Sequence, residues 1–69
     1  MPLAYANIGE KQVIRKICGS ACMKRRLEDI GFYVGGHVTV LMIVTGNLIV
    51  KICESRIAIC QEMATKIMV

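Results

Sequence analysis

Four cysteines are the residues of this chain best suited to bind a metal ion. Thiolates are good ligands for zinc and iron, and structural zinc sites usually contain C-x-x-C pairs. Neither the spacing of Cys18 and Cys22 nor that of Cys53 and Cys60 matches this motif. A transition-metal site (Fe or Zn) would need Cys18 to approach Cys22 and Cys53 to face Cys60 across a hairpin. We expect instead that the thiols are buried and pack as small hydrophobic side chains, with no cofactor.

Residues for catalysis are scarce. A nucleophilic site needs a Ser, Thr or Cys together with a base, usually His, and an acid. His37 is the only histidine and Asp29 the only aspartate, and the chain contains no glycine-rich phosphate loop and no His-rich zinc motif. We therefore expect that this protein is not an enzyme.

Basic residues are concentrated in one segment. The net charge is +4, and six of the nine Lys and Arg residues fall between residues 11 and 26, where no acid occurs. They are Lys11, Arg15, Lys16, Lys24, Arg25 and Arg26. A concentrated basic surface indicates an acidic partner, which is a nucleic acid, an anionic membrane surface or an acidic protein face. The alternative is a solvated face that keeps the protein soluble.

The composition limits the class of protein. With 69 residues, one domain spanning residues 1–69 is expected, and its core must be thin. An apolar content of 55% and a mean hydropathy of +0.56 exclude a disordered tail. The longest apolar run, Val40–Val44, is far shorter than a membrane span. Residues 1–5 do not resemble a signal peptide, so we expect a cytoplasmic protein with reduced thiols.

The apolar pattern predicts one helix, over residues 21–30. Met23, Leu27 and Ile30 share one face, as the i, i+4, i+7 spacing requires. Ser20 is suited to cap the first turn, and Gly31 suits the left-handed position that ends a helix.

The remaining segments predict strands, because Ile and Val together make up a quarter of the chain. The expected strands are 11–17, His37–Val44, Leu48–Cys53, Arg56–Cys60 and Lys66–Val69, with one helical turn at Gln61–Thr65. Five short strands and a short helix after the first strand describe a mainly β fold, a small partly open barrel.

The strand His37–Val44 alternates along its length. Val38, Val40, Met42 and Val44 are predicted to face the core together with Leu27 and Ile30 of the helix. Thr39, Leu41 and Ile43 then face outward, and Ile49 does so on the next strand. An exposed apolar patch of this kind marks an interface, so we expect a homo-oligomer or docking on a larger protein, unless another element covers the patch.

The order of these features resembles the FeoA family. The resemblance rests on the helix segment Arg25-Arg26-Leu27-x-x-x-Gly31-Phe32-x-x-Gly35 and on the strand His37-Val38-Thr39-Val40 that follows it. Ile57-Ala58-Ile59, followed by Ala64-x-x-Ile67, fits the ending of the same family, so the resemblance covers nearly the whole chain. Val34 departs from the pattern, because the family often has Pro there, and Glu54-Ser55 replaces a turn where Gly is common.

The resemblance implies an SH3-like barrel and a cytoplasmic accessory or regulatory protein of ferrous iron uptake. Its implied partner is the GTPase region of the FeoB-type permease. The candidate contacts are Lys24, Arg25, Arg26, Tyr33, Leu41 and Ile43. A metal-binding or metal-sensing module that uses the cysteines is the alternative function. A basic RNA-binding barrel is a third, but only three aromatic residues are present to stack on bases.

Overall fold

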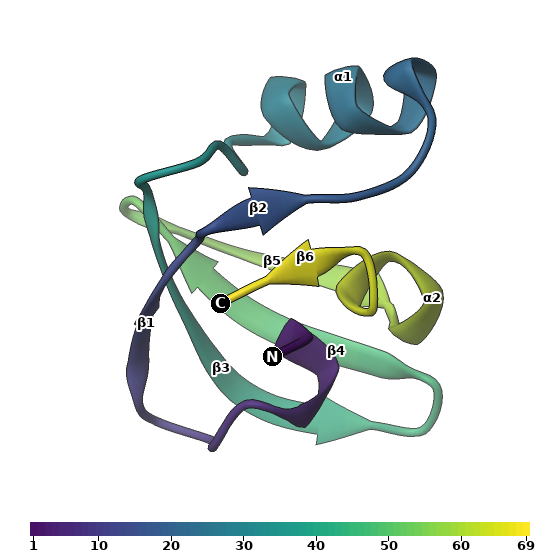
Figure 1. Ribbon diagram of the computed structural model, residues 1–69. Coiled ribbons are helices and arrows are strands. Elements are labelled where there is room, and N and C mark those ends of the chain that lie inside the picture. Colours follow the sequence, from purple (N-terminus) through teal and green to yellow (C-terminus); the bar gives the residue numbers. More distant parts are fainter.

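The computed structural model describes residues 1–69 and contains two antiparallel sheets (Figure 1). The larger sheet has the strand order β1-β3-β4-β5, and the smaller pairs β2 with β6. The strands are β1 (Lys11–Val13), β2 (Lys16–Ile17), β3 (His37–Val44), β4 (Asn47–Ile52), β5 (Ser55–Cys60) and β6 (Ile67–Met68). The helical elements are the 3-10 turn η1 (Leu3–Tyr5), α1 (Ala21–Ile30) and α2 (Gln61–Ala64). This is the mainly β, partly open barrel that the sequence predicts.

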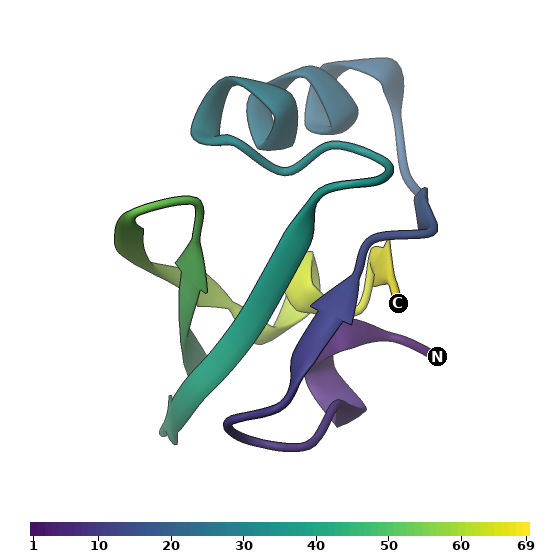
Figure 2. The same ribbon diagram turned by 90° about the vertical axis from the view of Figure 1, so that its left-hand side faces the viewer.

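The helix α1 forms where the sequence predicts it and lies at one end of the molecule in both views (Figures 1 and 2). The hydroxyl of Ser20 accepts a hydrogen bond from the Met23 amide at 3.2 Å, which satisfies one of the free amides of the first turn. Gly31 ends the helix with a φ of 124°, a region that strongly favours glycine. Leu27 is fully buried, but Ile30 is 44% exposed, so its predicted place in the core is wrong.

The predicted strand over residues 11–17 is two strands in two different sheets. β1 pairs with β3, whereas β2 pairs with β6. The chain changes sheets after Val13: the Ile14 amide donates to the Gly36 carbonyl, and the Arg15 amide donates to that of Met68, both at 2.8 Å. Val13, at the end of β1, is half-exposed, whereas Ile14, where the chain leaves this sheet, is fully buried. The apolar residues of the segment do not alternate regularly because the chain changes sheets between them.

A β-bulge at Leu41 changes which residues of β3 face the core. Val40 pairs with Val50, but the next registered pair is Met42 with Ile49. One extra residue inverts the alternation of side chains beyond it. Met42 therefore lies on the outer face of the sheet, and Val38 and Val40 alone of the four predicted inward residues are buried. Met42 and Val44 are 52% and 49% exposed, which corrects the prediction for both.

The core lies between the two sheets, α1 and the N-terminal turn. Phe32, two residues after the end of α1, is fully buried, as are Leu3 of η1 and Ile67 of β6. The other residues of the core are Ala6, Ile14, Ile17, Leu27, Val38, Val40, Leu48, Val50, Ile52, Ile59, Ala64 and Val69. The ends of the chain are tied together, because the Val69 amide donates to the Met1 carbonyl at 2.7 Å.

Candidate functional site

The three basic residues at the centre of α1 form an exposed surface, here called the basic face (Lys24, Arg25 and Arg26). All three are exposed, and Leu27, the next residue of the helix, is buried in the core. None of their side chains takes part in a hydrogen bond within the chain. Their charges are therefore available to an acidic partner.

Tyr33 lies in the loop of residues 31–36 between α1 and β3, and it is 52% exposed. Two backbone hydrogen bonds to Ile14 hold the loop against the end of β1. The Gly35 amide donates to the Ile14 carbonyl, and the Ile14 amide donates to the Gly36 carbonyl, both at 2.8 Å. Gly36 in turn donates to the Tyr33 carbonyl at 3.0 Å. These bonds fix the loop that carries the aromatic ring, although the side chain itself reaches solvent.

The predicted apolar contacts lie far from the basic face. Leu41 is the half-buried residue of the bulge, and Ile43 is 55% exposed near the turn that joins β3 to β4. Met42, Ile43 and Val44, all exposed, form what we call the hairpin tip. In both views this tip lies at the opposite end of β3 from α1 (Figures 1 and 2). The predicted contact residues therefore occupy two separate surfaces. Because of the bulge, Met42 and Val44 lie on the outer face instead of the core face, and Ile43, predicted to face outward, pairs with the buried Leu48 and lies on the other side.

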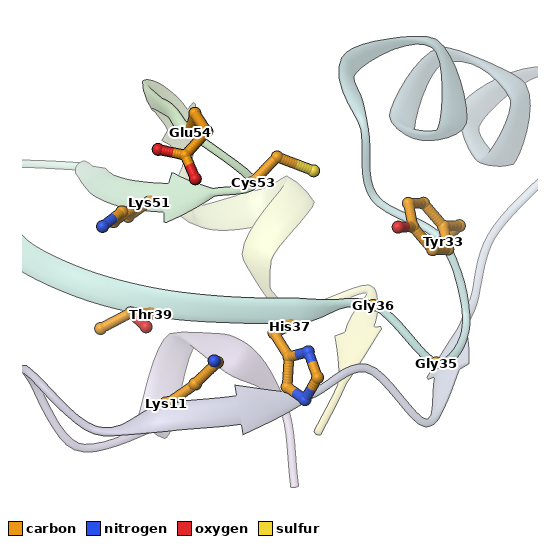
Figure 3. A pocket seen from close by; sticks show the side chains of 9 residues that line it. All are labelled: Lys11, Tyr33, Gly35, Gly36, His37, Thr39, Lys51, Cys53 and Glu54. Atoms are coloured by element: carbon orange, nitrogen blue, oxygen red, sulfur yellow. The ribbon is translucent and has the colours of Figure 1, made fainter.

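Tyr33 also lines a cleft that the sequence analysis did not identify. The cleft has a volume of about 450 Å³ and lies over the outer face of β1, β3 and β4, between the sheet and the loop that follows α1 (Figure 3). The residues that line it are Lys11, Tyr33, Gly35, Gly36, His37, Thr39, Lys51, Cys53 and Glu54. The cleft could be predicted only from the register of the strands, because Lys11, Thr39 and Lys51 are far apart in the sequence and meet only through strand pairing.

The four cysteines do not gather at one site. Cys53 lies in the turn before β5 and Cys60 at the other end of that strand, so they do not face each other across the hairpin as predicted. Cys22, Cys53 and Cys60 are exposed and Cys18 is half-buried, which contradicts the prediction of buried thiols. No three His, Cys, Asp or Glu side chains lie where they could hold a metal ion together.

Cys22 and Cys60 instead line one shallow groove between α1 and α2. The groove has a volume of about 260 Å³ and includes Met23, Arg26 and Met63. Cys22 and Cys60 are neither of the two pairs that the sequence spacing suggested. They meet at the groove because the end of β5, which leads into α2, lies near the start of α1.

No helix of the structure has the length and apolar character needed to cross a membrane.

Comparison with protein families and with known sequences points to one family. The family model described as "FeoA domain" matches residues 1–69 of this chain. A protein of Methanocaldococcus jannaschii named "Putative Fe(2+) transport protein A" is 35% identical over 68 residues, which cover 99% of this chain and 83% of that protein.

Solved structures share the fold. A crystal structure described as "Iron Uptake Regulatory Protein (FeoA)" superposes with a TM-score of 0.87 at 26% identity, covering 96% of this chain and 88% of the other. The FeoA of Stenotrophomonas maltophilia, solved with zinc and described as a prokaryotic SH3 domain protein, has a TM-score of 0.82 at 23% identity, with coverage of 99% and 87%. The latter likeness supports the SH3-like fold. The match along the whole chain and the identity to the Methanocaldococcus protein show that this protein belongs to the FeoA family.

Proposed function

We propose that this protein is a cytoplasmic accessory or regulatory protein of ferrous iron uptake that docks on the GTPase region of a FeoB-type permease. The observation that carries the proposal is membership of the FeoA family over residues 1–69. Relatives support the link to iron, since one is named for Fe(2+) transport and another is described as possibly acting as a ferrous iron transport activating factor.

In this proposal the basic face is the main docking surface. Lys24, Arg25 and Arg26 are exposed and hold no side-chain hydrogen bond within the chain. Charges placed this way accelerate association with an acidic surface and select against basic partners. Tyr33 follows on the adjoining loop and supplies an aromatic group, a residue type enriched at protein interfaces.

The apolar residues Leu41 and Ile43 form a second contact in the proposal. They lie in the half of β3 farther from α1, and the longest dimension of the molecule is 28 Å. A partner that engages both surfaces must therefore reach along the length of the barrel. Iron translocation and nucleotide hydrolysis belong to the partner, and this chain supplies the binding surfaces.

The basic face is tested with the double variant Arg25→Glu/Arg26→Glu, measured by calorimetry against the isolated cytosolic domain of the permease. Arg15→Glu/Lys16→Glu is the matched control. It reverses the charge of two exposed basic residues that are also consecutive in the sequence but lie at the start of the smaller sheet, outside α1. We expect the helix variant to lose affinity at least tenfold and the control to bind like the parent. Equal affinity of both variants would exclude the basic face as the docking surface.

A further inference from the structure

A row of basic residues crosses the outer face of the larger sheet. Lys11 pairs with Thr39, Thr39 pairs with Lys51, and Lys51 pairs with Arg56 on the edge strand β5. Side chains of residues directly opposite each other in neighbouring strands lie on the same face, with Cβ atoms about 4.5–5.5 Å apart. The register alone therefore places three cations and one hydroxyl side by side, and Figure 3 shows Lys11, Thr39 and Lys51 together.

This row is unfavourable for folding by itself. Like charges directly opposite in an antiparallel pair destabilise the sheet, and Lys51 faces Arg56 in this way. Neither Lys11 nor Lys51 takes part in a side-chain hydrogen bond within the chain. Glu54, at the rim, is the one acidic residue that lines the cleft. An anion bound over the row would relieve the repulsion.

Three residues of this row, Lys11, Thr39 and Lys51, line the floor of the cleft, whereas Arg56 does not line it. The loop of residues 31–36 closes one end, where its bonds to Ile14 hold Gly35 and Gly36 against the end of β1. Tyr33 stands on this wall with its hydroxyl turned toward the sheet (Figure 3). The cleft thus combines two ammonium groups with the hydroxyl donors of Thr39 and Tyr33.

We propose that this cleft binds a diphosphate-class anion. The lysine ammonium group binds phosphate as a compact point charge with three rotatable donors, so it needs no fixed orientation of the anion. Lys11 and Lys51 come from strands on either side of β3, about 10 Å apart at the backbone, so two linked phosphates could each meet one ammonium group over Thr39. A cation would be repelled by both lysines.

The test is an NMR titration of the isotope-labelled protein with inorganic pyrophosphate at low salt. We expect the amides of Lys11, Thr39 and Lys51 to shift in a saturable way, and added sodium chloride to weaken binding by screening. The variant Lys11→Gln/Lys51→Gln should raise the dissociation constant at least tenfold. Its spectrum also reports whether the fold is kept, which we expect because both side chains are exposed.

Two further variants separate a site from general attraction to a basic protein. Lys16→Gln/Lys24→Gln removes the same charge outside the cleft and should leave the affinity almost unchanged. Glu54→Gln removes the negative charge at the rim and should tighten binding. The proposal is wrong if pyrophosphate shifts no cleft amide, or if the control pair weakens binding as much as the cleft pair does.

The source of the diphosphate is distinguished with ADP. If the phosphates alone are recognised, ADP and pyrophosphate bind with similar affinity, and the site serves free diphosphate. If a nucleotide is recognised, ADP binds more tightly, and Tyr33→Ala removes the difference because the ring no longer contacts the nucleoside. Failure of this site leaves the docking proposal untouched, since the cleft lysines lie outside the basic face.

Discussion

The ring of Tyr33 occupies the space that a side chain on Gly36 would need. A Cβ atom at Gly36 would lie 3.1 Å from the Tyr33 carbonyl oxygen and 3.3 Å from a ring carbon. Glycine is therefore favoured at position 36 by a close approach, whereas Gly35, with a φ of 92°, is favoured by backbone conformation. The contact fixes the ring where the loop meets the sheet.

Gly36→Ala should lower the free energy of unfolding by about 1–2 kcal/mol, because the added methyl must push the loop backbone away. Urea denaturation measures this change. The companion double variant Tyr33→Ala/Gly36→Ala removes the ring but keeps the carbonyl, and it should recover only part of the loss. A stability equal to that of the parent for Gly36→Ala would show that the loop yields freely and does not position Tyr33.

Glycine should stabilise both hairpin turns, so adding it at one turn and removing it at the other should change the stability in opposite directions. Gly46 (φ 75°) joins β3 to β4, whereas Cys53, with a φ of 54°, has an equivalent left-handed conformation before β5. Left-handed backbone costs a non-glycine residue about 1–2 kcal/mol, and glycine loses about 0.5–1 kcal/mol through unfolded-state entropy. Cys53→Gly should therefore stabilise the protein by up to about 1 kcal/mol, and Gly46→Ala should destabilise it by about 1 kcal/mol. Thermal unfolding of both variants checks the signs, and a loss of stability in Cys53→Gly would contradict the argument.

The two apolar residues of α1 have unequal roles. Leu27 is fully buried, so Leu27→Ala should cost about 2–5 kcal/mol through lost burial and the cavity that remains. Ile30 is 44% exposed, so Ile30→Ala should change stability by no more than about 0.5 kcal/mol. Urea denaturation midpoints with unchanged slopes give both values. Similar losses in the two variants would mean that Ile30 belongs to the core after all.

These contrasts show which features are local in the sequence. The helix could be predicted because Ser20, Leu27 and Gly31 each act within a few residues of the element they specify. The bounds of β3 follow from alternation and from the glycines before and after it. Phe32, which belongs to the segment that carries the family resemblance, is fully buried.

Other features depend on which strands become neighbours. The bulge at Leu41 exists only relative to β4, and the break after Val13 only because β6 returns beside β2. Both segments have the same β-rich composition on either side of the irregularity, so composition cannot locate it. The cleft was not predicted for the same reason, since Lys11 and Lys51 approach only through their pairing with Thr39.

The hairpin tip gives a final prediction about the partner. Ile43 pairs with Leu48, which is buried, yet Ile43 itself is 55% exposed because the core does not extend to this end of the sheet. Ile43→Lys should therefore leave the fold intact. If Leu41 and Ile43 form the second contact, this variant should lower affinity for the cytosolic domain of the permease about tenfold, which corresponds to about 1.4 kcal/mol.

Tyr5→Lys is its matched control, because Tyr5 is 68% exposed on η1, outside both surfaces. Calorimetry on both variants, together with Arg25→Glu/Arg26→Glu combined with Ile43→Lys, shows whether one partner engages both ends. Losses that add in the combined variant mean that the two surfaces contribute independently to one complex, as expected for sites at opposite ends of β3. Unchanged binding of Ile43→Lys would restrict the interface to the basic face and leave the exposed apolar tip without a role in docking.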